Sequence, residues 1–83
     1  MGIKEILAKN VKLYRSRLGY SQEELAGICN NLRENDGLAN RSFISDIENC
    51  RRNISLDKLE LLAMALNVEP HQLLLTKSPS ERI

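Results

Sequence analysis

The sequence predicts an all-α protein, a compact bundle of five helices. Apolar residues recur at intervals of three or four positions along most of the chain, which is the period of a helix that buries one face. Aromatic residues make up only 4% of the sequence, so the core has to be built from Leu, Ile, Val and Ala, a composition that favours helices. Residues suited to begin or end a helix stand between the apolar stretches.

Length and composition predict one small domain. The chain has 83 residues, of which 42% are hydrophobic and 28% are charged, a balance typical of a folded protein. We expect the domain to span residues 1–76 and residues 77–83 to form a flexible C-terminal tail. The net charge of +1 excludes a polybasic segment, so contact with nucleic acid would depend on where the cations lie. No apolar run approaches a membrane span or a signal peptide, which predicts a cytoplasmic protein.

Two helices are expected in the first part of the chain. The first has an apolar stripe along one face, made of Ile3, Leu7, Val11, Tyr14 and Leu18. Gly19 follows, at the position where a left-handed residue would end the helix. Ser21 and Glu24 then form the pattern of a capping box, which opens a second helix. The apolar face of this helix comprises Leu25, Ala26, Ile28 and Cys29.

A third helix is expected from Arg41 to about Asn49, with Asn40 as its N-cap. Its apolar residues fall on one side of a helical wheel: Phe43, Ile44 and Ile47. Its polar residues centre on the opposite side: Arg41, Ser42, Ser45, Asp46 and Asn49. Such a polar side is often simply solvated. Ser and Asn, however, are poor helix formers, and short side chains let a helix come close to another surface, which favours a contact face.

A fourth helix is expected after Ser55, with an apolar stripe of Leu56, Leu59, Leu62, Ala63 and Leu66. Asn67 tolerates the left-handed conformation that would end it. A short fifth helix is expected in "EPHQLLL", with Pro70 in its first turn. A short helix cannot bury three consecutive leucines against its own core. We therefore expect a symmetric dimer interface drawn from a small apolar set: Leu66, Val68, Leu73, Leu74 and Leu75.

The motifs taken together resemble a known family. "SQEELA" followed by "RSFISDIENCRRNISLDKLELLAMALNV" is similar to the phage-repressor and Cro-type helix-turn-helix family, the lambda-repressor-like DNA-binding domains. Within that family, the sequence most resembles the controller proteins of restriction-modification systems. The resemblance covers about residues 3 to 75. It implies that the second and third helices form a helix-turn-helix, with the third helix in the major groove of DNA.

The resemblance also implies roles for particular residues. The positions that read bases in the family are occupied by Arg41, Ser42, Ser45 and Asp46, and the position of Arg52 also approaches bases in the controllers. Phosphate contacts are implied for Gln22, Asn49, Arg51 and Asn53. An arginine in the first turn of the third helix can bind guanine O6 and N7 bidentately. Arg15 and Glu48 stand where the family has an internal ion pair between the first and third helices, so their implied role is structural.

The sequence departs from the family pattern in three places. An insertion of about Asn30 to Gly37 lengthens the turn between the second and third helices. It would either extend the second helix and loop back over the surface, or tilt the third helix and weaken DNA binding. Asp46 would face phosphates that repel it, although a carboxylate can accept a hydrogen bond from cytosine N4. Cys50 stands where the family often has Gly, so the exit from the third helix is expected to differ.

No catalytic, metal or cofactor site is indicated. His71, the only histidine, shares no motif with a Cys, a Ser or paired carboxylates, and the sequence has no Gly-rich phosphate loop. Cys29 and Cys50 lack the spacing of metal ligands and are expected to be reduced thiols. We therefore expect no enzymatic activity, no cofactor, no small-molecule ligand and no membrane contact.

The predicted function is sequence-specific transcription regulation. The expected partner is double-stranded DNA, bound as a palindromic operator by a homodimer whose two third helices lie roughly 34–36 Å apart. Two alternatives stay open. One is an antitoxin-type regulator of a toxin–antitoxin pair, which uses the same domain. The other is a helical protein-interaction module whose lengthened turn has abandoned DNA.

Overall fold

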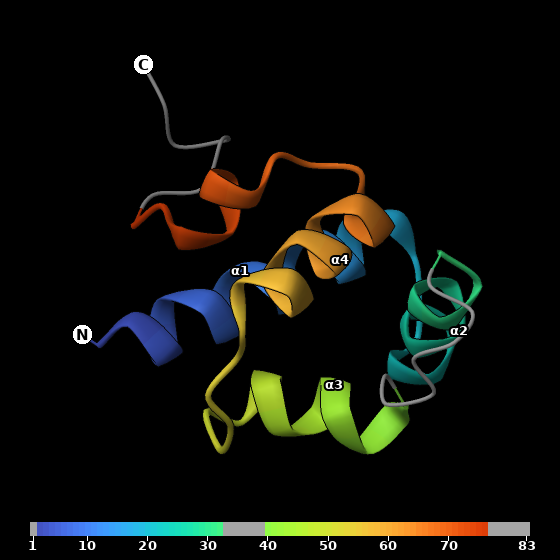
Figure 1. Cartoon of the computed structure of the whole chain (residues 1–83), viewed down its shortest axis with the longest axis horizontal. Coiled ribbons are helices and arrows are strands. Elements are labelled where there is room, and N and C mark those ends of the chain that lie inside the picture. The colour runs from blue at the N-terminus through green and yellow to red at the C-terminus, as the bar shows by residue number, and fades with distance from the viewer. Residues whose placement is uncertain (1, 33–39, 77–83) are drawn as a thin grey trace.

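The computed structural model describes residues 2–32 and 40–76, which form four α-helices and no strand (Figure 1). The elements are, in order, α1 (Ile3–Leu18), α2 (Gln22–Leu32), α3 (Arg41–Glu48), α4 (Leu56–Leu66) and a 3-10 helix, η1 (Pro70–Leu74). Residues 30–32 continue α2, as the first of the two expectations for the insertion requires. The rest of the insertion, residues 33–37, and the expected tail at residues 77–83 lie outside the described residues.

The prediction of a fifth α-helix is wrong. Residues 70–74 form a 3-10 helix, so the described residues contain four α-helices instead of five. The segment has only five helical residues between an extended Glu69 and an extended Leu75. So short a segment gains too few α-helical hydrogen bonds to offset the cost of nucleating an α-helix, whereas 3-10 turns are common in short connectors. Pro70 lies in the first turn, as expected.

Side-chain caps begin three of the helices at the predicted positions. The Ser21 hydroxyl accepts a hydrogen bond from the Glu24 N–H at 3.0 Å, and the Glu24 carboxylate accepts one from the Ser21 N–H at 2.8 Å. Asn40 and Ser55 each accept from the backbone N–H three residues on, at 2.9 and 3.2 Å. These bonds satisfy N–H groups that have no partner within the helix, so they fix where α2, α3 and α4 begin.

Three helices end in the same backbone motif, with a left-handed residue just after the helix: Gly19 (φ 76°), Cys50 (φ 61°) and Asn67 (φ 60°). In each case the N–H of the next residue donates to the carbonyl five positions earlier, at 2.8–3.1 Å. This pair of reversed bonds is the Schellman motif, which satisfies the last carbonyls and turns the chain back. Glycine and asparagine adopt the left-handed conformation readily, whereas Cys50 carries a Cβ penalty there.

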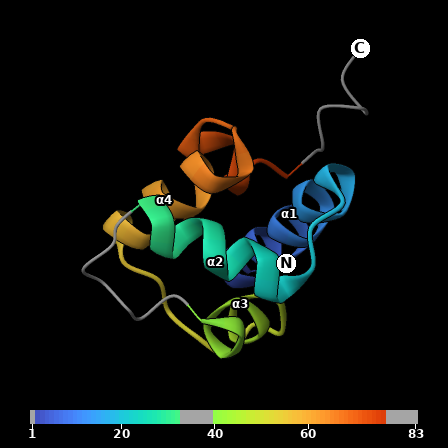
Figure 2. The ribbon, with the colours of Figure 1, turned by 90° about the vertical axis from the view of Figure 1, so that its right-hand side faces the viewer.

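The core lies where α1, α2, α3, α4 and η1 meet. Helix α2 packs against both α3 and α4 (Figure 2), while η1 packs against α1 and α4. The largest fully buried side chains are almost all aliphatic: Val11, Leu25, Ile44, Ile47, Leu61, Leu62, Leu66 and Leu73, together with Cys29. Leu56, expected on the buried stripe of α4, is instead 82% exposed. It begins α4, and the helix buries Leu61 and Ala65 farther along.

Asn10 joins η1 to α1 through its side-chain amide. The side chain is 4% exposed, and Nδ2 donates to the carbonyl oxygens of Leu73 and Leu75, each at 2.8 Å. The carbonyls of a short 3-10 helix and its exit have few internal partners, so a buried donor satisfies them. The sequence contains a signal for this residue, because Asn10 interrupts the apolar stripe between Leu7 and Tyr14.

Candidate nucleic-acid interface

Helix α3 turns its polar side outward. Phe43, Ile44 and Ile47 are at most 3% exposed and pack into the core. On the opposite side, Arg41, Ser42 and Asn49 are exposed and Ser45 and Asp46 are half-buried. The small size of Ser42 and Ser45 leaves the helix backbone close to whatever surface approaches it. The residues that the resemblance assigns to base reading thus lie together on one accessible surface.

An internal ion pair joins α1 to α3 just behind this surface. Arg15 Nε lies 2.6 Å from Glu48 Oε2, and Arg15 Nη2 lies 3.0 Å from Glu48 Oε1, a bidentate pair. A third bond runs from Arg15 Nη1 to the Tyr20 carbonyl at 2.8 Å. The hydrogen bond with Glu48 raises the pKa of the Arg15 guanidinium, an effect that burial partly offsets. The pair fixes α3 relative to α1 and to the turn before α2.

Gln22, to which the resemblance assigns a phosphate contact, takes part in the same network. Its Nε2 donates to Glu48 Oε1 at 3.1 Å, and its side chain is half-buried. Glu48 therefore receives donors from both α1 and α2. A phosphate contact through the Gln22 amide nitrogen would have to share or replace this bond.

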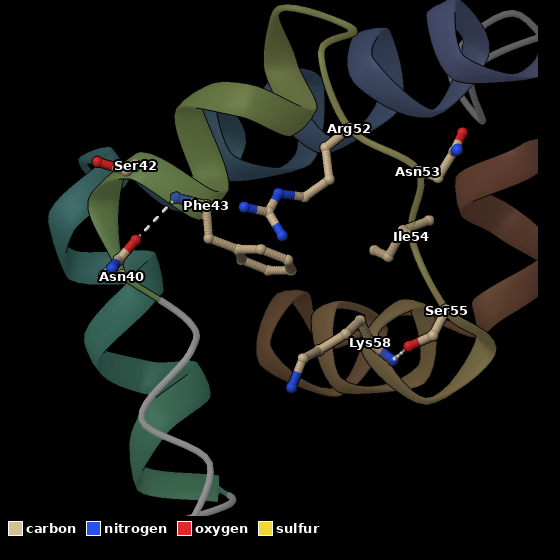
Figure 3. Close-up of a pocket in the computed structure, with 8 residues that line it drawn as sticks. All are labelled: Asn40, Ser42, Phe43, Arg52, Asn53, Ile54, Ser55 and Lys58. Atoms are coloured by element: carbon tan, nitrogen blue, oxygen red, sulfur yellow. Dashed lines mark hydrogen bonds between the residues drawn. The ribbon is translucent and has the colours of Figure 1, made fainter.

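The segment that follows α3 folds back over the helix. Asp46 Oδ1 lies 3.8 Å from Arg51 Nη1, and Asp46 Oδ2 lies 3.7 Å from Arg52 Nη2. The Arg52 guanidinium carbon lies 5.2 Å from the centre of the Phe43 ring, within range of a cation–π contact (Figure 3). Asn49 also bonds locally, because its Nδ2 donates to the Ser45 carbonyl at 2.8 Å. Including Gln22, six of the expected DNA-contacting residues thus have partners inside the protein.

A polar pocket opens beside the first turn of α3, between that turn, the exit segment and the start of α4 (Figure 3). It is lined by Asn40, Ser42, Phe43, Arg52, Asn53, Ile54, Ser55 and Lys58. Ser42, Arg52 and Asn53 were expected at the interface, whereas Lys58 was not. The position of Lys58 in the first turn of α4, three residues after the Ser55 cap, is the sequence feature that could have indicated it.

The five residues expected at the dimer interface differ in how far they are buried. Leu66 and Leu73 are at most 2% exposed and belong to the core of this chain, so their assignment to an interface is wrong. Both pack into the hydrophobic core of their own chain. The apolar sequence alone does not distinguish this core from a dimer interface. Val68 and Leu74 are half-buried and Leu75 is 40% exposed. Leu74 also lines a mainly apolar groove with Ile3, Ile54, Leu56 and other residues.

In the ranges 2–32 and 40–76, no three His, Cys, Asp or Glu side chains are grouped so that they could hold a metal ion. None of the helices described is both long and apolar enough to cross a membrane.

Comparison with known proteins identifies relatives of this chain, although no protein-family model matches it. A hypothetical transcription factor of Neisseria meningitidis serogroup B is 42% identical over 81 residues, which are 98% of this chain and 67% of the relative. Control protein C.SmaI of Serratia marcescens is 45% identical over 74 residues, 89% of this chain and 79% of the relative. Control protein C.BamHI of Bacillus amyloliquefaciens is 39% identical over 66 residues, which are 80% of this chain and 69% of the relative.

The fold agrees with these relationships. The crystal structure of the Neisseria transcription factor matches this chain with a TM-score of 0.78 at 42% identity, covering 98% of this chain and 82% of that one. Sequence and structure lead to the same group of proteins. The chain therefore belongs to the phage-repressor and Cro-type helix-turn-helix family of transcriptional regulators, within which it is related to the restriction-modification controllers.

Proposed function

We propose that the chain is a sequence-specific regulator of transcription that binds a palindromic operator as a homodimer, with α3 in the major groove. The observation that carries this proposal is the two-sided character of α3. The residues on its apolar side are at most 3% exposed. Arg41, Ser42 and Asn49 are exposed on the other side. A helix held in this way can enter a groove without disturbing the core.

Base reading would fall to the first turns of α3. Arg41 is exposed at the N-terminal end of the helix, where a guanidinium can bind guanine O6 and N7. Ser42 and Ser45 would add hydrogen bonds to base edges with little steric demand. Arg52, which lines the pocket beside the first turn of α3 together with Ser42, would be the second arginine in reach of bases.

Phosphate contacts would flank this surface and set its register on the duplex. Arg51 and Asn53 are exposed after α3, and the pocket beside them adds Lys58 and the start of α4. Gln22 and Asn49 would contribute from their half-buried and exposed positions at the edges of the surface. Because the net charge of the chain is only +1, the attraction to DNA phosphates would depend mainly on these few local cations.

Dimerisation would use the apolar surface that the monomer leaves uncovered. Leu75, Leu74 and Val68 are the exposed or half-buried members of the expected set. The apolar groove that Leu74 shares with Ile3 and Leu56 adjoins this surface, and its other edge, lined by Arg52 and Asn53, belongs to the proposed DNA surface. Because two relatives bear the name control protein, we propose that the regulated genes belong to a restriction-modification system.

Selection of bound duplexes from a random pool tests the proposal. We expect a palindromic site, bound with an affinity that falls steeply with salt, by a logarithmic slope of about −0.9 per phosphate contacted. Arg41→Ala should weaken binding to the selected site by about 10- to 100-fold while largely sparing binding to a scrambled duplex. Lys9→Ala is the matched control, because Lys9 lies on the side of α1 opposite the buried Val11.

Two outcomes would contradict the proposal. Recovery of no preferred duplex, with no salt-dependent binding, would favour a protein-interaction module. Equal loss on the selected and the scrambled duplex in Arg41→Ala would show that Arg41 contacts phosphate and does not read a base.

A further inference from the structure

We propose that Asp46 is a positioning residue for Arg52, and that it determines specificity by aiming this arginine instead of reading a base itself. The proposal rests on the proposed function, since it concerns how the same surface meets DNA. It revises the role that the family resemblance implies for Asp46.

The backbone turns back on itself at the exit of α3. The left-handed Cys50 reverses the chain, and the Arg51 N–H donates to the Asp46 carbonyl at 2.8 Å. The two residues after the turn are therefore returned to the last turn of the helix they have just left. Without this reversal, Arg51 and Arg52 would extend away from α3.

Two contacts hold the Arg52 guanidinium. Its Nη2 lies 3.7 Å from Asp46 Oδ2, and its carbon lies 5.2 Å from the centre of the buried Phe43 ring. A planar guanidinium held by a carboxylate and an aromatic face loses much of its freedom before DNA arrives. In Figure 3 the guanidinium extends over the ring toward the pocket beside the first turn of α3.

Asp46 also partly neutralises the two arginines after α3. Each Asp46 oxygen already faces a guanidinium, because Oδ1 lies 3.8 Å from Arg51 Nη1. The Asp46 side chain is 30% exposed, against 46% for Arg52 and 68% for Arg51, so the carboxylate lies beneath the two cations. The carboxylate thus weakens the non-specific electrostatic attraction of both arginines to phosphates, while it orients Arg52. Removing its charge should change specific and non-specific binding in opposite directions.

A double-mutant cycle on the duplex selected from the random pool tests this role. Asp46→Asn keeps the shape of the side chain and removes its charge. We expect it to weaken binding to the selected duplex about tenfold, and to change binding less than about twofold in an Arg52→Ala background. Binding to a scrambled duplex should tighten by about two- to fivefold, because two arginines lose a neutralising neighbour. Asp46→Glu, which restores the charge, should recover part of the loss only when Arg52 is present.

A measurement without DNA tests the geometry. The Phe43 ring should shift the NMR signals of the Arg52 side-chain protons in the free protein, and Asp46→Asn should reduce this shift. Glu69→Gln, which removes a carboxylate at η1, should leave both the shift and the DNA affinities unchanged.

The contrary outcomes are distinguishable. Equal loss from Asp46→Asn in both backgrounds would overturn the proposal and favour direct contact between Asp46 and a base. An unchanged Arg52 signal in Asp46→Asn would overturn it as well. Failure of the unsubstituted protein to select any duplex would instead overturn the proposed function, and this inference with it.

Discussion

The residue that turns the chain after α3 is a cysteine in a conformation that glycine adopts at little cost. Cys50 has φ 61°, whereas the equivalent position after α1 holds Gly19 and that after α4 holds Asn67. An L-residue with a Cβ loses roughly 1–2 kcal/mol in this region. The Cys50 thiol gains only one weak contact, 3.8 Å from the Lys4 carbonyl. The exit of α3 is therefore strained where the other two helix ends are not.

Cys50→Gly should accordingly stabilise the protein. We expect the free energy of unfolding to rise by about 0.5–1 kcal/mol, since relief of the left-handed strain exceeds the entropy that glycine adds to the unfolded chain. Urea unfolding measures the change, and Asn67→Gly, at a position already tolerant of this conformation, is the control. A loss of stability in Cys50→Gly would show that the thiol contact outweighs the strain.

The other cysteine gives a dependence of stability on pH. Burial raises the pKa of the Cys29 thiol from 9.0 to about 11, with a small opposing effect of Lys58. The folded state holds this proton more tightly than the unfolded state, so the contribution is fully present below about pH 9 and is lost as the pH rises toward 11. The free energy of unfolding should therefore fall more steeply over this interval than in Cys29→Ala. Parallel curves for the two proteins would contradict the prediction.

Sequence reasoning succeeded at the residues whose role is local and failed where the role depends on distant parts of the chain. The caps at Ser21, Asn40 and Ser55 follow from neighbouring letters, and the structure has all three. The exposure of Leu56 depends on where the bundle ends, and the burial of Leu73 depends on α1 and α4. The contacts of Asp46 with Arg51 and Arg52 were not expected either, because nothing in the sequence shows that the chain turns back after α3.

At the scale of elements, the three helices nearest the proposed DNA surface are joined through Glu48. Its side chain is 4% exposed and accepts from Arg15 on α1 and from Gln22 on α2. A buried carboxylate with three charge-assisted or polar donors is well compensated, but only while all of them remain in place. The orientation of α3 thus depends on a polar contact as well as on Phe43, Ile44 and Ile47.

Removing either Arg15 or Glu48 should lower the free energy of unfolding strongly. Removing the other one as well should lower it much less. Glu48→Ala or Arg15→Ala should lower the free energy of unfolding by about 3 kcal/mol each, because the remaining charge is left without its partner. The double variant should lose clearly less than the sum of the two single changes. Urea unfolding of the four proteins measures this coupling. Additive losses would show that the pair contributes no more than two independent side chains.

The elements themselves were largely predictable, with two exceptions. Helices α1 to α4 follow from apolar periodicity and caps, and the resemblance placed α2 and α3 in a helix-turn-helix. The η1 segment was expected to be an α-helix because its apolar pattern does not distinguish five residues of 3-10 helix from one α-helical turn. The extension of α2 to Leu32 was left open, because the insertion has no counterpart in the family pattern.

At the scale of the whole molecule, the proposed DNA surface and η1 lie at opposite ends of the bundle (Figures 1 and 2). A dimer formed near η1 would leave both α3 helices uncovered, as binding to two half-sites requires. Apolar surface is available there, since Leu75 is 40% exposed and Leu74 is only half-buried.

Leu75→Asp should separate the protomers. A carboxylate placed in an apolar contact is desolvated without a partner, so the dimer dissociation constant should rise by about 10-fold or more. Sedimentation across a range of protein concentrations measures the change. Leu18→Asp is the matched control, because Leu18 is 43% exposed but lies at the end of α1 that precedes α2. A shift to monomer in Leu18→Asp alone would place the contact elsewhere.

The Asn10 amide also bears on how such regulators diverge after gene duplication. Because it holds the Leu73 and Leu75 carbonyls, the path of this segment is set by main-chain atoms that every amino acid possesses. The side chain of Leu75 can then change during evolution without displacing the backbone that carries it. In the dimer proposed above, copies of this domain within one cell would then be able to acquire incompatible contact surfaces and avoid mixed pairing, while each keeps the same fold.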